Sequence, residues 1–328
     1  MDLIKDKFER IIDYMRISIT DRCNLRCIFC MPAGGMKPIE PQNSLTSGEI
    51  IRIARMAAGL GVKKIRLTGG EPLIRKDLPS LVESIRHVEG IEDISLTTNG
   101  QLLKNHAHTL VRAGLNRVNV SLDSLKPDRY REITRGGDIK NVFEGIQEAE
   151  WEGLLPIKIN MVPIKGVNDD EIGEFARLTL TTPFHIRFIE LMPMGHRDWW
   201  GWDKYVPMDE IQKGVSALGP LSPVKLRSAG PARYFHFEKA QGVVGFISPI
   251  SHHFCNSCNR LRITSDGKLR PCLFSESEID LKSAMRSGAS DSEIERLLKL
   301  SVEIKPEGHS LNRETTFGYL RSMSRIGG

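Results

Sequence analysis

The sequence of 328 residues has few aromatic side chains (6%) and only a small excess of positive charge, 46 Lys and Arg against 41 Asp and Glu. Proteins that mainly bind nucleic acid usually have a strongly basic face and aromatic platforms for the bases, so we expect no nucleic-acid partner. The small positive excess still suits a ligand that carries phosphate.

Long apolar runs are missing as well. No stretch approaches the roughly 20 apolar residues that a membrane helix needs, so we expect no membrane partner. The segment from Met1 to Tyr14 alternates charged and apolar residues and lacks the apolar core of a signal peptide. These absences predict a cytoplasmic protein.

Cysteine is scarce, with six residues, and the six fall into two triplets: Cys23, Cys27 and Cys30, then Cys255, Cys258 and Cys272. A long chain without a secretion signal is a poor candidate for a disulfide framework. Clustered thiols in a reducing compartment usually hold metal, so each triplet is a candidate metal site.

Short runs rich in β-branched residues alternate with helical patterns up to Met194. We expect strands at 15–20, 64–68, 93–97, 117–122, 157–162 and 185–191, and helices at 47–59, 77–88, 102–113, 139–152 and 169–180. Thr46 and Glu49 form a capping box for the first helix. This alternation predicts parallel βα units. Their number suits either a doubly wound sheet or an incomplete (β/α)6 barrel of the TIM type, and periodicity does not decide between them.

The pattern changes near residue 200, where we expect a boundary between a first domain, 1–200, and a C-terminal region, 201–328. The segment Pro193–Pro207 holds three of the four tryptophans and predicts a long loop. Short strands are expected at 224–227, 232–237, 243–248 and 261–264, and helices at 276–286 and 291–300. This mixture predicts an α+β region.

The first triplet has the spacing Cys-x3-Cys-x2-Cys and follows the first expected strand. Three thiolates leave one position open on an iron–sulfur cube or a zinc ion. No further Cys or His lies between Asp13 and Lys63. A zinc ion with a distant fourth ligand remains the alternative. The triplet resembles the signature of radical S-adenosylmethionine (SAM) enzymes, and Thr68-Gly69-Gly70-Glu71-Pro72 resembles their methionine-binding loop.

The second triplet has the spacing Cys-x2-Cys-x13-Cys. A zinc ribbon with His252 or His253 as the fourth ligand competes here with a second iron–sulfur cluster that has an open iron. Arg260 and Arg262 lie between these cysteines and alternate along an expected strand, so that both guanidiniums leave the same face. Such a pair suits an anionic substrate, because guanidinium groups match phosphate geometry.

Several motifs together resemble the molybdenum cofactor biosynthesis protein A family, the GTP 3′,8-cyclases. They are the two triplets, Asp21-Arg22-Cys23-Asn24, the Gly-Gly-Glu-Pro loop, Cys258-Asn-Arg-Leu-Arg262 and the final Met323-Ser-Arg-Ile-Gly-Gly328. The resemblance implies an incomplete (β/α)6 barrel with a 4Fe-4S cluster at its mouth, closed by a C-terminal α+β region with a second 4Fe-4S cluster.

The same resemblance implies the reaction. A 5′-deoxyadenosyl radical from SAM removes the 3′ hydrogen of GTP, and the product is (8S)-3′,8-cyclo-7,8-dihydroguanosine 5′-triphosphate, an intermediate of molybdenum cofactor biosynthesis. The implied partners are GTP as substrate, an electron donor and the downstream cyclic pyranopterin monophosphate synthase. Members of the family are often homodimers, although no interface is evident in this sequence.

Residue roles follow from the resemblance. The six cysteines would hold the two clusters. SAM would contact Phe29, Gly70, Glu71, Ser121 and Met192. GTP would contact Arg16, Arg66, Thr97, Lys158, Arg260 and Arg262. The catalytic group would be Arg16 together with Gly327 and Gly328, whose tail would enter the active site and help to trigger SAM cleavage.

Two other functions are weighed against this one. The first is another radical SAM enzyme with an auxiliary cluster, such as a peptide-modifying enzyme, although those usually contain more cysteines. The second is a zinc-stabilised nucleic-acid-binding protein, which the weak charge excess and the scarcity of aromatic residues disfavour.

Overall fold

The computed structural model describes residues 3–194, 199–226, 230–311 and 321–327. Six parallel strands follow one another across the sheet in chain order. They are β1 (Tyr14–Ser18), β2 (Lys64–Thr68), β3 (Asp93–Thr98), β4 (Arg117–Ser121), β5 (Lys158–Met161) and β6 (His185–Ile189). A doubly wound sheet would reverse its strand order at a switch point. The unbroken order therefore confirms the incomplete barrel expected for this chain.

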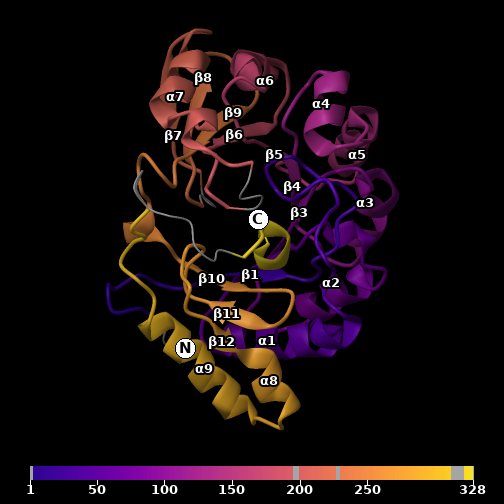
Figure 1. Ribbon diagram of the computed structural model, residues 1–328, viewed down its shortest axis with the longest axis vertical. Coiled ribbons are helices and arrows are strands. Elements are labelled where there is room, and N and C mark those ends of the chain that lie inside the picture. Colours follow the sequence, from indigo (N-terminus) through magenta and orange to yellow (C-terminus); the bar gives the residue numbers. More distant parts are fainter. Residues whose placement is uncertain (1–2, 195–198, 227–229, 312–320, 328) are drawn as a thin grey trace.

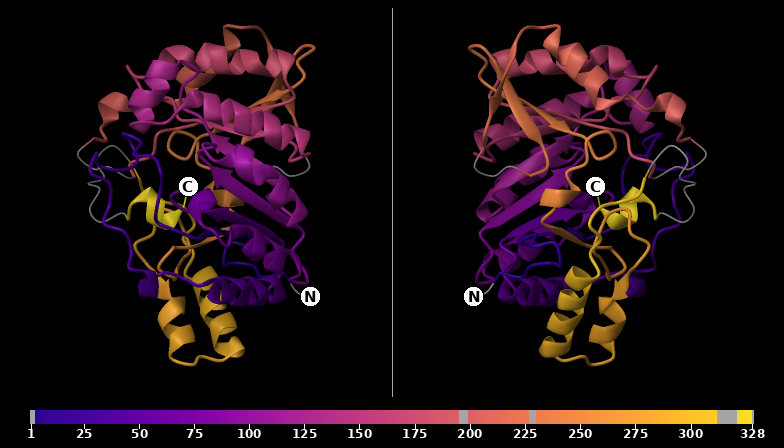
Figure 2. Two further views of the ribbon diagram at one scale, coloured as in Figure 1. Left: turned by 90° about the vertical axis from the view of Figure 1, so that its right-hand side faces the viewer. Right: turned by 90° about the vertical axis from the view of Figure 1, so that its left-hand side faces the viewer.

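Helices connect these strands and cover the outside of the sheet (Figures 1 and 2). They are α1 (Ser47–Gly59), α2 (Leu78–Arg86), α3 (Leu103–Arg112), α4 (Pro127–Thr134), α5 (Ile139–Trp151) and α6 (Ile172–Thr181). The expected capping box of α1 is present, because Thr46 and Glu49 exchange side-chain and backbone hydrogen bonds. The apolar residues of α1 and of the central strands are almost fully buried and form one continuous core. Burial of apolar area on this scale is the main force that holds the sheet and its helices together.

The C-terminal part of the chain extends the same sheet at both edges. Strand β9 (Val243–Ile247) pairs in parallel with β6, and β10 (Arg260–Ile263) pairs in parallel with β1. Beyond them lie antiparallel β8 (Arg233–Phe237) and β7 (Leu221–Val224) on one side, with β11 (Lys268–Arg270) and β12 (Ile279–Asp280) on the other. The order runs from β12 to β7, and these two end strands do not pair within the described residues. The barrel is therefore open.

Figure 1 shows the two C-terminal additions on opposite sides of the barrel strands, with the C-terminus between them. Helix α7 (Met208–Ser216) accompanies β7–β9, whereas α8 (Leu281–Arg286) and α9 (Asp291–Glu303) project beyond β10–β12 (Figure 2). A short helix, α10 (Met323–Ile326), ends the described chain beside β1. Because one sheet runs through both regions, the boundary near residue 200 stays a prediction.

Several details differ from the sequence-based expectation, and strands β11 and β12 were not expected. The strand expected at 224–227 is wrong, since β7 runs over Leu221–Val224 and contains Pro223. An edge strand tolerates proline because one side of its backbone needs no partner. Helix α4 was not expected, and the helix expected at 276–286 begins only at Leu281. No described helix is long and apolar enough to cross a membrane.

Candidate active site

The first cysteine triplet lies in the loop after β1 and rests against the end of α4. The amides of Arg26 and Ile28 donate to the carbonyls of Thr134 (3.1 Å) and Ile133 (2.9 Å). Arg135 donates to the carbonyls of Arg26 (3.0 Å) and Met31 (2.8 Å) from the other side. These contacts fix the backbone on both sides of Cys27 and Cys30.

The loops after all six barrel strands meet in one cavity at the carboxyl ends of the strands, where folds of this type bind ligands. This first cavity is lined by eight of the residues predicted from the sequence: Cys23, Cys27, Phe29, Cys30, Gly70, Thr97, Ser121 and Met192. Asp123, Asn160 and Met323 line it as well. Asn99 donates to Cys23 Sγ over 3.8 Å, and the amide of Leu25 donates to the same sulfur over 3.4 Å.

The Gly-Gly-Glu-Pro loop is packed tightly against the first cysteine loop. A Cβ atom on Gly70 would collide with the carbonyl of Arg22, so only glycine fits there. Glu71 does not line this first cavity. It is fully buried and accepts hydrogen bonds from the amides of Leu73 (3.0 Å) and Asn99 (2.7 Å) and from Thr98 Oγ1 (2.8 Å). We therefore propose that Glu71 holds this loop, in place of the contact with SAM expected from the sequence.

The second triplet lies toward the opposite ends of the strands: Cys258 comes just before β10, whose first residue, Arg260, is in register with Tyr14 at the start of parallel β1. Cys255, Cys258 and Cys272 line a second cavity together with Arg16, Arg260, Arg262, Lys305 and His309. Arg10 fixes this loop, because it donates to the carbonyl of Cys255 (2.6 Å) and to the carbonyls of Pro306 (2.6 Å) and Glu307 (2.7 Å). Arg10 is itself paired with buried Asp6 over 2.6 Å.

Within the described residues, neither triplet is by itself as closely packed as three thiolates on one zinc ion would be. Zinc–sulfur bonds of about 2.3 Å in a tetrahedron place the sulfurs about 3.8 Å apart. Neither triplet forms a group with all ligand atoms within 4.8 Å of one another, since the one such group in the described chain is His253, Cys255 and His309. All six cysteines are free thiols, and the expectation of no disulfide holds.

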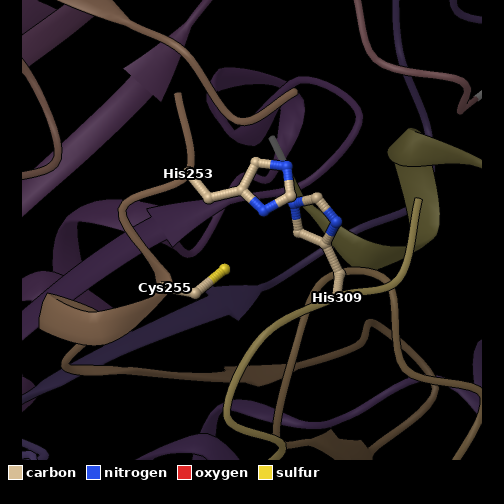
Figure 3. A group of neighbouring side chains, drawn as sticks. All are labelled: His253, Cys255 and His309. Carbon is tan, nitrogen blue, oxygen red and sulfur yellow. The ribbon is translucent and has the colours of Figure 1, made fainter. Parts of the chain in front are cut away.

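The group of His253, Cys255 and His309 could hold a metal ion by itself (Figure 3). The two histidine rings lie 4.2 Å apart between centroids. His309 Nε2 is hydrogen-bonded to the carbonyl of Pro249 (2.7 Å), and its Nδ1 accepts from the amide of Leu311 (3.3 Å), so a metal ion would have to displace one of these contacts. His252, the other histidine considered from the sequence, is directed to Asp209 instead (2.8 Å). Zinc at this group and a cluster on the second triplet would compete for Cys255.

A third cavity between the two triplets is strongly basic. It is lined by the predicted residues Arg16, Arg66, Thr97 and Lys158, and further by Tyr14, Lys64, Arg117, Asn160 and Arg187. Arg16 is in register with Arg262 on one neighbouring strand and with Arg66 on the other. Like charges side by side on one face of a sheet repel each other, so this row needs an anion to balance it.

The charges of this third cavity shift the ionisation of its own members. Burial, followed by repulsion from Arg187, Arg117 and Arg66, lowers the pKa of Lys158 to about 7. Burial also lowers the pKa of Arg66 to about 10. Within the described residues, the buried Thr97 Oγ1 and Arg260 Nε have no hydrogen-bond partner. A bound polyanion would relieve both the repulsion and the missing hydrogen bonds.

The C-terminal tail enters the space between the three cavities. Arg262 donates to the carbonyl of Gly327 over 2.9 Å, and Met323 lines both cysteine-bearing cavities. Gly327 has a φ of 81°, and a Cβ atom there would collide with Thr68 Oγ1. Gly328, the other predicted tail residue, lies outside the described residues. Ile189 at the end of β6 lines all three cavities, so they form one connected site.

Comparison with known proteins agrees with this arrangement. Residues 17–179 match the family model of the Radical SAM superfamily, and residues 184–311 match Molybdenum Cofactor Synthesis C. The GTP 3′,8-cyclase of Thermodesulfovibrio yellowstonii is 50% identical over 327 residues, 99% of this chain and 100% of the relative. That of Moorella thermoacetica is 50% identical over 326 residues, with the same coverage.

The chain belongs to the GTP 3′,8-cyclase family.

Solved structures agree at the level of the fold. SuiB of Streptococcus suis bound to S-adenosylmethionine superposes with a TM-score of 0.59 at 16% identity, over 88% of this chain and 68% of that chain. SuiB bound to its precursor peptide SuiA gives the same TM-score at 17% identity, over 85% of this chain and 66% of that chain.

The structure adds residues to the site of this GTP 3′,8-cyclase family member that no motif indicated. Asp123, Arg117, Arg187, Lys305 and His309 line the three cavities. Arg117 and Arg187 lie at positions of β4 and β6 that alternate with apolar core residues, so the strand period was an available signal for them. Lys305 and His309 follow a surface helix and carry no such signal.

Proposed function

We propose that this chain is a radical SAM GTP 3′,8-cyclase that converts GTP to (8S)-3′,8-cyclo-7,8-dihydroguanosine 5′-triphosphate in molybdenum cofactor biosynthesis. One observation carries the proposal: the two cysteine triplets line cavities that share Ile189, Met192 and Met323, and a row of three arginines, Arg262, Arg16 and Arg66, lies in register on neighbouring strands. Membership of the GTP 3′,8-cyclase family indicates that the substrate of this site is GTP.

The residues divide the work by position. Cys23, Cys27 and Cys30 would hold the first 4Fe-4S cluster, and Phe29, Gly70, Ser121 and Met192 surround the space for SAM beside it. When bound, the cluster and SAM supply a 5′-deoxyadenosyl radical that removes the 3′ hydrogen of GTP. Cys255, Cys258 and Cys272 would hold the second cluster, against which the guanine base lies.

The basic residues would hold GTP between the two clusters. Arg16, Arg66 and Lys158 line the third, basic cavity. Arg260 and Arg262 line the second cavity, beside the cysteines that would hold the second cluster. Rigid strands carry all five, which keeps the ribose at a fixed distance from SAM. The tail at Gly327 and Gly328 would reach SAM through Arg262, which links substrate binding to SAM cleavage.

The proposal extends to the partners of the enzyme and to its place in the cell. We propose an electron donor for the first cluster and a cyclic pyranopterin monophosphate synthase as the next enzyme. A homodimer and the cytoplasm are proposed as the working state and place. The free thiols of both triplets support a reducing compartment.

Anaerobic incubation with GTP, SAM and dithionite tests the proposal. We expect 5′-deoxyadenosine and a cyclised GTP product in equal amounts, and about eight irons per chain for two cubes. Omission of GTP and the variant Cys258→Ala are the controls, and neither should give the product. Stoichiometric zinc without sulfide would overturn the proposal.

A further inference from the structure

Lys305 lies just beyond the end of α9, and its side chain is enclosed behind the second triplet. Only 2% of the residue is exposed, and it is among the largest fully buried side chains of the described chain. Its Nζ donates to the carbonyl of Arg260 over 2.8 Å and to the carbonyl of Pro271 over 2.6 Å. One ammonium thus joins the backbone of β10 to the residue that precedes Cys272.

The buried ammonium has no carboxylate partner among the described residues. Two basic residues near it do: Arg10 pairs with Asp6, and Arg270 pairs with Glu278. An isolated buried charge costs much free energy unless an opposite charge compensates it. The negative groups that act on Lys305 are the thiolates of Cys258 and Cys272, while Arg10 and Arg260 oppose it.

This arrangement makes sense once a cluster is bound. A 4Fe-4S cluster held by three thiolates is an anion, and one-electron reduction adds a further negative charge. A fixed positive charge nearby favours the reduced state, because the Coulomb attraction grows with the charge of the cluster. Fixed charges and hydrogen bonds around a cluster are the levers by which a protein sets its potential.

We propose that Lys305 is a positioning residue that serves as the buried counter-charge of the second cluster and raises its reduction potential. The proposal rests on the cluster assignment of the proposed function. Arg260 and Cys272 face the substrate space, so the same ammonium holds the cluster and the arginine beside it in one register.

The test is a redox titration with dithionite, followed by electron paramagnetic resonance, on the reconstituted full chain. Cys23, Cys27 and Cys30 are replaced by Ala so that all signal comes from the second cluster, and the wild-type holoenzyme is titrated in parallel. Lys305→Gln keeps two N–H donors but removes the charge. Lys299→Gln removes a charge from an exposed position on the preceding helix α9 and is the matched control.

We expect Lys305→Gln to lower the ratio of reduced to oxidised cluster at least tenfold at fixed potential, which is a midpoint shift of about 59 mV for one electron. Lys299→Gln should leave the titration unchanged. A purely structural role predicts that Gln behaves like Lys, and an unchanged midpoint in Lys305→Gln overturns the proposal.

If Lys305→Gln fails to bind the second cluster, the variant Lys305→Arg, which restores the charge, shows whether the missing charge is the cause. Iron content regained with Arg supports the counter-charge, and iron content lost with both variants contradicts it. The proposed function is judged separately, by cyclised GTP from the wild-type chain. A shifted midpoint without that product would leave the inference standing and remove the function.

Discussion

The two cysteine triplets have the same donors but opposite surroundings. The first lies beside buried carboxylates, Glu71 and Asp123, and burial raises the pKa of both to about 7. The second lies among Arg10, Arg260 and Lys305. Burial raises the pKa of Cys30 to about 12, whereas at Cys258 the cations outweigh burial and lower the pKa to about 7.

This contrast teaches that the surroundings, not the ligands, distinguish the two sites. Positive neighbours favour a more reduced cluster, and negative or apolar neighbours disfavour it. We therefore expect the first cluster to be the stronger electron donor, as cleavage of SAM requires, and the second to accept charge more readily.

The largest expected effect is that loss of each triplet stops a different step of the reaction. Cys27→Ala should abolish formation of 5′-deoxyadenosine, because the SAM-binding cluster is lost. Cys258→Ala should keep SAM cleavage with dithionite but lose the cyclised GTP. Both variants should fall from about eight to about four irons per chain, measured by iron and sulfide assay. Product formation by Cys258→Ala would contradict a role for the second triplet in the reaction.

The tail between the triplets gives the next largest effect. Gly327→Ala should reduce product formation at least 100-fold with both clusters retained, because its Cβ would collide with Thr68 Oγ1. A loss of about 2.7 kcal/mol in transition-state stabilisation corresponds to that factor. Gly288→Ala is the matched control, since Gly288 has a similar φ of 89° and nothing within 4 Å of the added Cβ. Equal activities of the two variants would show that the tail is dispensable.

The basic cavity that contains Lys158 should make the KM for GTP depend on pH. The free site holds Lys158 at a pKa of about 7, and a bound triphosphate raises that pKa. GTP then favours the charged amine, so the KM should be lowest below pH 7 and rise up to about tenfold per pH unit above it. Lys158→Met should remove this rise, whereas Lys140→Met, at an exposed position, should not. A rise that persists in Lys158→Met would assign it to another group.

The smallest effect concerns the arginines that fix the two loops. Arg135→Lys and Arg10→Lys keep the charge but lose one or more charge-assisted hydrogen bonds to the loop backbone, each worth about 1.5–3 kcal/mol. Arg135→Lys should speed loss of the first cluster to a chelator a few-fold, and Arg10→Lys should do so for the second. If each variant weakened both clusters equally, the two sites would not be independent.

Much of the barrel could be predicted from the sequence. Buried parallel strands are rich in β-branched residues, and all six expected strands begin within one residue of their observed starts. Helix α4 was missed because it is polar along most of its length, with only Tyr130, Ile133 and Thr134 buried. Its packing against the first cysteine loop depends on tertiary contacts, which local patterns do not contain.

The candidate site divides in the same way. The cysteines and the glycine loop are visible because they are close in sequence. The row of Arg262, Arg16 and Arg66 is not, because a sheet register joins residues almost 250 positions apart. Glu71 shows the opposite failure: its motif was found, yet the structure directs its carboxylate to neighbouring amides.

The position of β9 and β10 has a consequence for synthesis of the chain. A ribosome completes β1–β6 long before it reaches Val243–Ile263, and until then β1 and β6 both present unpaired backbone edges. A product that stops near residue 200 would therefore be prone to edge-to-edge association and would not persist as an independent half-enzyme. Strands that are made late in synthesis, β9 and β10, thus cover the edges of strands that are made early, β6 and β1. The first half of the chain is protected only once the second half has been made.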